Sequence, residues 1–204
     1  MIQANLSPHN VISEDDRADY QMADHLHMYE FALRLIEHKA VKPAADKRHK
    51  PPKEFVLAMI DRIGAKDARE REYLKTLLHG TYGKYMHLRP YTRRIICARF
   101  ARHKEGESPL GIPELLEVMG SIINGYNTPL KEEHKQFMRE GLFALWLVRV
   151  STGGDGCMYE PMLLYCIREL VSKDPTLLGE ARNCSVQLGL AVQNAAWDAM
   201  ECHL

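Results

Sequence analysis

Residues 68–138 decide the fold; they open with AREREYLKTLLHGTYGKYMHLRPYTRR (68–94) and close with ELLEVMGSIINGYNTPLKEEHKQF (114–137). Within 68–88, apolar residues recur at spacings of three, four and one, which places them on one face of a helix: Tyr73, Leu74, Leu77, Leu78, Tyr82 and Tyr85. Asp67 suits the N-cap of that helix. A second helix is predicted over 89–103, because Pro90 fits a first helical turn and Ile95, Ile96 and Phe100 follow as an apolar stripe.

The same pattern continues outward along the chain. A third helix is predicted over 112–126, ended by Gly125 and the run 127–129, and a fourth over 130–148. An earlier helix is predicted over 20–40, with a broad apolar face: Met22, Leu26, Tyr29, Phe31, Ala32, Leu35 and Ile36. Further helices are predicted over 53–63 and, after the glycine-rich break at 151–156, over 158–173. No strand pattern separates them. Helical hairpins in series bury their apolar faces by stacking, so the sequence predicts an all-α fold of the α-solenoid type.

The sequence predicts that the chain divides into three parts. Residues 1–18 are polar and are predicted to be a flexible N-terminal arm. Residues 19–178 form the solenoid, in which about four to five repeats of roughly 40 residues fit. Residues 179–204 are predicted to be a divergent C-terminal helix or tail.

Composition narrows the function classes. The chain has 204 residues, 46% of them hydrophobic, so it can bury a core. Its formal net charge of zero argues against a nucleic-acid binder. The N-terminus lacks the apolar core of a signal peptide, and no run is long enough to span a membrane. Five cysteines without a CxxC spacing fit reduced thiols, so an intracellular protein is expected.

Several segments resemble the B′ (B-prime) regulatory subunits of protein phosphatase 2A. The strongest are EREYLKTLLH (70–79), YGKYMHLR (82–89), ELLEVMGSIING (114–125) and PLKEEHKQF (129–137), supported by HMYEFALRLIE, KEFVLAMID and LLYCIRELVSKDPTL. The resemblance covers roughly residues 25–178. It implies a solenoid of HEAT-like helical hairpins and a non-catalytic regulator of a serine/threonine phosphatase, with the scaffold and catalytic subunits as partners. The expected location is the cytoplasm, with the nucleus as a second compartment.

Basic and aromatic residues gather at the ends of two neighbouring hairpins. Taken alone, these residues are more simply solvated helix ends, although with Val118 and Ile122 they also suit a peptide that carries aliphatic anchors and an acid. The resemblance favours the second interpretation, because B′ subunits bind Leu-x-x-Ile-x-Glu motifs in a groove between central repeats. It implies that Tyr82 and Arg89 flank the isoleucine, Val118 and Ile122 lie beneath it, and Lys131 and His134 border the leucine. The predicted peptide-binding residues are His79, Tyr82, Arg89, Glu117, Val118, Ile122, Lys131 and His134.

One position departs from the family pattern. The family reads His-Arg-Ile-Tyr-Gly-Lys where this chain reads HGTYGK from His79 to Lys84. Gly80 therefore replaces an arginine that the resemblance places near the acidic part of the motif. Loss of one charge-assisted contact weakens binding by roughly 1.5–3 kcal/mol.

Other chemistries find little support in the sequence. Ten histidines include no HExxH pattern and no trio at a zinc spacing, and no nucleophile motif is present. We therefore expect no catalytic residue, no metal and no cofactor. Three alternatives stay open: a peptide-binding adaptor that no longer assembles with the phosphatase, an enzyme that uses histidine and glutamate, and a fragment that does not fold independently. The tail could also come from an altered reading frame or splice form.

Overall fold

A computed structural model describes residues 14–38, 51–151, 158–177 and 179. All regular structure in these ranges is helical. The elements are α1 (Glu14–Glu37), α2 (Lys53–Arg62), α3 (Ala68–Lys84), the 3-10 turn η2 (Met86–Leu88), α4 (Arg89–Lys104), α5 (Ile112–Asn124), α6 (Glu132–Glu140), α7 (Leu142–Ser151) and α8 (Glu160–Lys173). The prediction of an all-α fold is confirmed.

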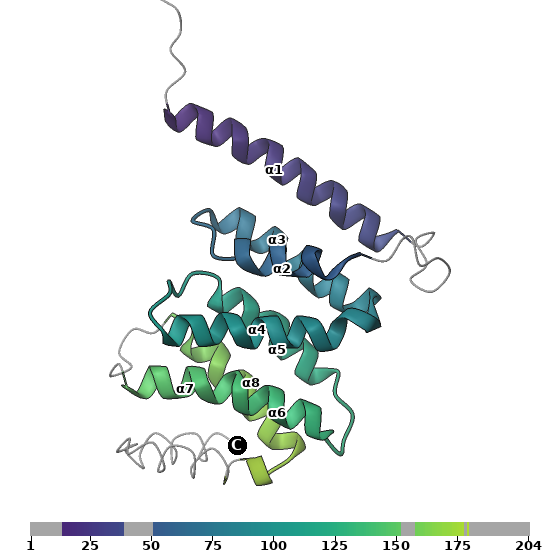
Figure 1. The fold of residues 1–204 in the computed structure, drawn as a ribbon, viewed down its shortest axis with the longest axis vertical. Helices are drawn as coiled ribbons and strands as arrows, with labels where there is room; N and C mark the ends of the chain where they lie inside the picture. Colours follow the sequence, from purple (N-terminus) through teal and green to yellow (C-terminus); the bar gives the residue numbers. More distant parts are fainter. Residues whose placement is uncertain (1–13, 39–50, 152–157, 178, 180–204) are drawn as a thin grey trace, which may run out of the picture.

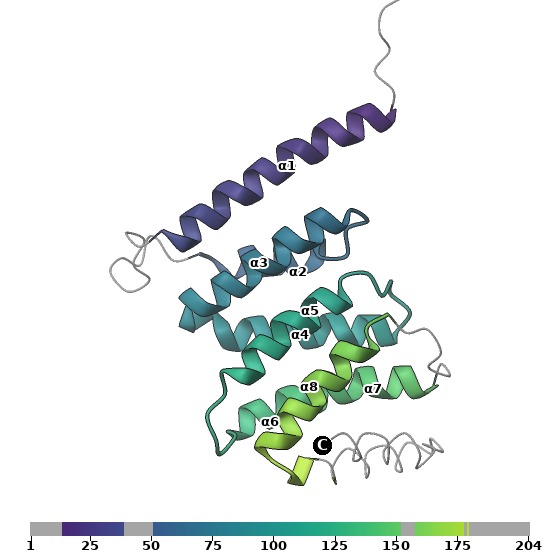
Figure 2. The ribbon, with the colours of Figure 1, turned by 180° about the vertical axis from the view of Figure 1, so that it is seen from behind.

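The helices stack in two layers (Figures 1 and 2). In one layer α1 packs on α3, α3 on α5, and α5 on α8; in the other, α2 packs on α4, which packs on α6 and α7. Within the described residues, the hairpins α2–α3, α4–α5 and α6/α7–α8 therefore follow the single helix α1. This arrangement is that of an α-solenoid. The number of repeats in the whole chain stays a prediction, because residues 180–204 lie outside the described part.

Contacts between neighbouring layers recur at a nearly constant sequence separation. Tyr29 and Glu70 are 41 residues apart, Arg71 and Glu114 are 43 apart, and Asn124 and Tyr165 are 41 apart. In the second layer, Arg93 and Glu133 are 40 apart. Equivalent turns of successive hairpins thus meet, as expected when each repeat contacts mainly its neighbours.

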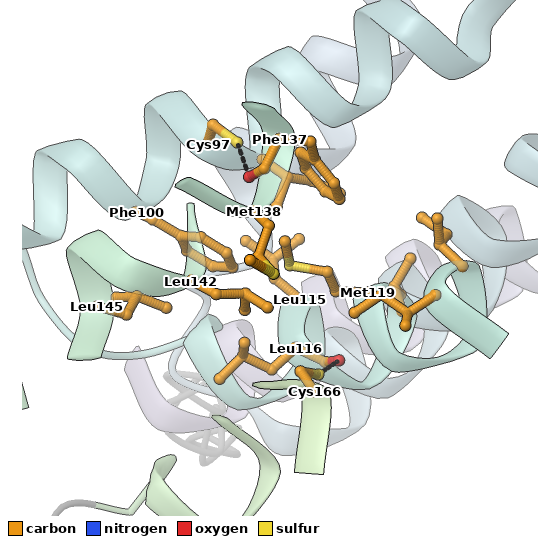
Figure 3. Packing of buried hydrophobic residues seen from close by; sticks show 14 of the residues in the cluster. Cys97, Phe100, Leu115, Leu116, Met119, Phe137, Met138, Leu142, Leu145 and Cys166 are labelled. Carbon is orange, nitrogen blue, oxygen red and sulfur yellow. Dashed lines mark hydrogen bonds between the residues drawn. The ribbon is translucent and has the colours of Figure 1, made fainter. Parts of the chain in front are cut away.

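The predicted apolar stripes form one continuous core. Leu74, Leu77 and Leu78 of α3 are at most 2% exposed. Ile96 and Phe100 of α4 and the apolar stripe of α5 are buried with them, and Ile95 is partly buried. Figure 3 shows this core, in which Phe100 of α4, Leu115 of α5, Met138 of α6, Leu142 of α7 and Cys166 of α8 gather. Two thiols lie in this core, where the Cys97 Sγ donates to the Phe137 carbonyl at 3.5 Å. Burial raises the pKa of both Cys97 and Cys166 to about 12, so these thiols stay protonated.

The predicted helix over 130–148 is two helices, α6 and α7, separated at Gly141. A Cβ at this position would lie 3.0 Å from the Phe137 carbonyl oxygen, 3.1 Å from the Cys97 Sγ and 3.4 Å from the Met119 Cε. Glycine therefore permits α4 and α5 to approach the chain where it bends. The predicted helix over 68–88 likewise ends at Lys84, and the turn η2 carries the chain into α4.

The N-terminal boundary also differs from the prediction. Helix α1 begins at Glu14, so residues 14–18 are helical rather than part of an arm. Its apolar face is narrower than predicted: Tyr29, Ala32, Leu33 and Ile36 pack on the core, whereas Phe31 and Leu35 are 65% and 47% exposed. The placement of residues 1–13 and of the C-terminal tail lies outside the described residues.

Candidate peptide-binding groove

Helix α3 is fixed at both ends by polar contacts. At its start, the Asp67 carboxylate accepts from the Arg69 backbone N–H at 2.7 Å, which confirms the predicted N-cap. At its end, the Arg89 guanidinium donates to the carbonyls of Tyr82 and Gly83 at 2.9 and 3.0 Å. Arg89 also lies over the Tyr82 ring at 5.2 Å. A cation is favourable at this helix end, so Arg89 has a structural role as well as a predicted binding role.

A cleft of about 200 Å³ lies between α3 and α5. Its walls include three of the predicted residues, His79, Glu117 and Val118. Two hydrogen bonds cross it: the Lys75 ammonium bonds the Glu117 carboxylate at 2.5 Å, and His79 Nε2 pairs with the Ser121 hydroxyl at 2.9 Å. We call this space the α3/α5 cleft.

A second cluster of side chains links α3 with α4 and α6. The Arg93 guanidinium donates to the Tyr82 hydroxyl at 3.1 Å and to Glu133 at 3.2 Å. The His134 ring stacks on Tyr126, with centroids 3.8 Å apart and an angle of 5° between the planes. His134 Nε2 also lies 3.5 Å from the Glu133 carboxylate, so Glu133 and Arg93 connect Tyr82 with His134 across three helices. The structure thus brings two distant predicted residues into one network.

The electrostatics of the network favour a neutral imidazole. Burial, together with the nearby charges of Arg93 and Lys131, lowers the pKa of His134, and Glu133 opposes this only in part. Its Nδ1 is buried and has no hydrogen-bond partner among the described residues. His134 therefore presents an aromatic surface rather than a charge to the end of the groove at neutral pH.

The remaining predicted residues differ in exposure. Val118 and Ile122 are only 2% and 5% exposed, so they offer a narrow apolar floor rather than an open pocket. Ile122 does not line the α3/α5 cleft itself. Lys131 is exposed and is the residue that precedes the first turn of α6.

Sequence reasoning missed several residues of this region. Lys75, Thr76 and Ser121 line the cleft, and Arg93 and Tyr126 complete the network. The sequence does indicate Lys75, because it lies four residues before His79 and therefore on the same face of α3. The pairing of Lys75 also has a charge consequence: burial acts to lower its pKa, but hydrogen bonds to Glu117 and Glu72 raise it overall.

Gly80 does not face the α3/α5 cleft. A Cβ built on it would lie 3.2 Å from Cγ2 of Ile36 on α1. The position of the missing arginine therefore points toward the neighbouring interface between α1 and α3. A larger residue at 80 requires Ile36 to move.

The described residues also limit other chemistries. In residues 14–38, 51–151 and 158–177, no three His, Cys, Asp or Glu side chains gather as a metal site would need. None of the helices in these ranges is both long and apolar enough to cross a bilayer.

The class of protein defined by this fold and cleft is an α-solenoid with an inter-repeat groove, and comparison with known proteins gives its family. The model of the family described as "Protein phosphatase 2A regulatory B subunit (B56 family)" matches residues 2–185. The chain belongs to this family, as its resemblance to B′ subunits predicted.

Comparison with individual proteins gives the same family. The human delta isoform of the 56 kDa regulatory subunit of serine/threonine-protein phosphatase 2A is 42% identical over 167 residues, which are 80% of this chain and 27% of that relative. The human beta isoform is 43% identical over 151 residues (74% and 29%), and the mouse alpha isoform is 40% identical over 151 residues (74% and 30%). These relatives are named regulatory subunits. The chain spans less than a third of their length.

Proposed function

We propose that this chain is a non-catalytic regulatory subunit of protein phosphatase 2A that recruits substrates through Leu-x-x-Ile-x-Glu motifs. The observation that carries the proposal is the groove formed by the α3/α5 cleft and the adjoining network of Tyr82, Arg93 and His134. Its partners are the scaffold and catalytic subunits and proteins that bear the motif. It acts in the cytoplasm, and the nucleus is a second expected location.

The groove suits the three anchors of the motif. The leucine lies beside the His134 ring and the stem of Lys131, and the isoleucine lies between Tyr82 and Ile122. The glutamate then approaches His79 and Lys75. It competes there with Glu117, which already bonds the Lys75 ammonium. Because that competition reduces the gain from the new ion pair, the hydrophobic anchors supply most of the affinity.

The test is a fluorescence-anisotropy titration of a labelled motif peptide against the full chain. We expect saturable binding, and no binding of a peptide in which leucine and isoleucine are both alanine. His79→Ala and Lys131→Glu change exposed side chains of the groove and should weaken binding about three- to thirtyfold, on the order of 0.7–2 kcal/mol.

Lys104→Glu reverses an exposed charge at the far end of α4 and is the matched control. Equal affinity of all variants would contradict the proposed groove. Arg89 is a poor first target, because its guanidinium bonds the last carbonyls of α3.

A second candidate function is a peptide-binding adaptor that no longer assembles with the phosphatase. Motif binding in the α3/α5 cleft is common to both functions, so the cleft alone does not separate them. Co-purification of tagged chain with purified scaffold and catalytic subunits separates the two: capture of both subunits supports the regulatory subunit, and motif binding without capture supports the adaptor.

A further inference from the structure

Helix α3 borders a second cleft on its other side. This cleft, about 510 Å³ in volume, lies between α1 and α3 and is lined by Leu33, Ala68, Arg69, Glu72, Tyr73 and Thr76. We call it the α1/α3 cleft. The α3 residues 69, 72, 73 and 76 follow the spacing of one helix face. Nothing in the proposed function above uses this face.

The α1/α3 cleft meets the α3/α5 cleft at Thr76, which lines both. Its hydroxyl donates to the Glu72 carbonyl at 3.0 Å and is thereby satisfied within the helix. A bound peptide that leaves the α3/α5 cleft can therefore pass over Thr76 without breaking a hydrogen bond between α3 and another helix.

The surface of the α1/α3 cleft is mainly apolar, and Tyr73 in its wall is held in place before any ligand binds. The Tyr73 ring stacks on Tyr29 with centroids 6.5 Å apart, and the Tyr29 hydroxyl donates to the buried Glu70 at 2.7 Å. The two charged residues that line the cleft already form ion pairs. Arg69 bonds Asp67 at 2.7 Å, and Glu72 bonds Lys75 at 2.7 Å. The cleft therefore favours an uncharged apolar side chain over an acidic or phosphorylated one.

The direction of the bound motif leads to this cleft. Its leucine lies at α6 and its isoleucine between α3 and α5, so the peptide runs toward α3 from its N-terminus to its C-terminus. From Tyr82 to Thr76 is about 9 Å along the axis of α3, which about three extended residues span. Tyr73 is about 4.5 Å further along the axis, and the peptide must also pass around α3 to its other side, so two or three more residues reach Tyr73.

We propose that the α1/α3 cleft binds an apolar side chain about five or six positions after the motif isoleucine, on the C-terminal flank of the same peptide. This inference rests on the proposed function and adds a specificity-determining subsite to it. Partners with an aromatic or large aliphatic residue at that position are bound more tightly than partners with a polar flank. Motif-bearing proteins would thus be ranked by a residue outside the motif.

The test compares two labelled peptides of equal length, one with a Gly/Ser flank and one with phenylalanine at the sixth position after isoleucine. Against the full chain, the phenylalanine peptide should bind about five- to twentyfold more tightly, since part of the gain from burying the ring is lost in ordering the flank. Ala68→Trp fills the cleft and should abolish this gain while the Gly/Ser peptide keeps its affinity. Ala98→Trp makes the same change at an exposed position of α4 and is the matched control.

The outcomes separate the inference from the proposed function. Binding of the Gly/Ser peptide without a gain from phenylalanine, or a gain that persists in Ala68→Trp, overturns the subsite and leaves motif binding intact. Binding of neither peptide overturns both. Thermal unfolding of each variant shows whether it is folded; if Ala68→Trp is not, Leu33→Ala replaces it and should reduce the gain by at least half.

Discussion

The two clefts beside α3 share one helix but differ in chemistry. The α3/α5 cleft is the smaller, about 200 Å³ against 510 Å³, and hydrogen bonds from Lys75 and His79 cross it. The α1/α3 cleft has Leu33, Ala68 and Tyr73 among its lining residues; Arg69 and Glu72, which also line it, pair with residues on or next to α3 itself. One helix can thus present charge to one segment of a peptide and apolar surface to the next.

Substitutions that disturb the α3/α5 side should lower the free energy of unfolding more than substitutions on the α1/α3 side. Gly111 begins α5 with φ +85°, and a Cβ there would lie 2.4 Å from the carbonyl oxygen of Ile63 at the end of α2. Gly111→Ala should therefore destabilise the fold by about 3–5 kcal/mol, because backbone strain and a clash with backbone act together. Urea unfolding measures the change.

A second glycine, Gly106, separates the cost of backbone strain from the cost of the clash. Gly106 also has positive φ, +105°, but apart from its chain neighbours no described residue has a heavy atom within 4 Å of the position that a Cβ would take. Gly106→Ala should cost only about 1–2 kcal/mol. Equal costs at the two positions would mean that α5 can shift away from α2 and that Gly111 does not fix the α3/α5 cleft.

The α1/α3 side depends on one buried carboxylate. Glu70 is 3% exposed and accepts from the Tyr29 hydroxyl and from the Arg62 guanidinium at 2.7 and 2.9 Å. Glu70→Ala should cost about 2–3 kcal/mol, because both donors lose their acceptor. It should also abolish the gain from a flanking phenylalanine while binding of the core motif changes less than about twofold.

Glu30→Ala is the control for that change on the neighbouring helix. It removes an exposed pair with Arg34 and should cost less than about 0.5 kcal/mol. If Glu70→Ala and Glu30→Ala lower the free energy of unfolding equally, the buried contact does not hold α1 to α3.

Much of this arrangement could be predicted from the sequence, and the exceptions have a common cause. The stripes of α3, α4 and α5 and the Asp67 cap depend on spacing within one helix, which the sequence contains. The bend at Gly141 depends on Cys97 and Met119, and the exposure of Phe31 depends on how much of α1 its neighbours cover. Those contacts join residues about 20 to 45 positions apart, and periodicity within a helix does not reveal them.

The candidate site shows the same limit. His79, Glu117 and Val118 could be placed together by family resemblance, and the structure brings them to one cleft. Arg93 and Tyr126 escaped notice because their role depends on Glu133 and His134, which belong to the next hairpin. The sequence indicates a lost binding charge and a lower helix propensity at Gly80, whereas the structure shows that this position also sets the distance from α3 to Ile36.

Gly80 provides a smaller test of the α1/α3 interface. Alanine favours a helix over glycine by up to about 1 kcal/mol, but its Cβ would lie 3.2 Å from Ile36. Gly80→Ala alone should change stability by less than about 0.5 kcal/mol, whereas in an Ile36→Ala background it should stabilise by about 0.5–1 kcal/mol. A double-mutant cycle of urea unfolding measures this coupling. Equal effects in both backgrounds would exclude a close approach of Ile36.

The smallest expected effect is a pH dependence at the end of the groove. His134 has a lowered pKa in the folded chain, so folding favours its neutral form. The stability that it contributes is fully present above its ordinary pKa of 6.5 and is lost as the pH falls through its folded pKa. Replacement by glutamine should therefore reduce the loss of stability between pH 7.5 and 5, as measured by urea unfolding at each pH. An unchanged or steeper loss would show that His134 is not held neutral.

The central claim is that a motif peptide lies between α3 and α5. The most direct measurement is photo-crosslinking of the full chain with a motif peptide that carries a photoreactive analogue at the isoleucine, followed by mass spectrometry of the labelled segment. The account predicts labels within residues 79–82 of α3 and 118–122 of α5, suppressed by excess unlabelled motif peptide. Labels confined to other helices, or labelling that the competitor does not suppress, would contradict it.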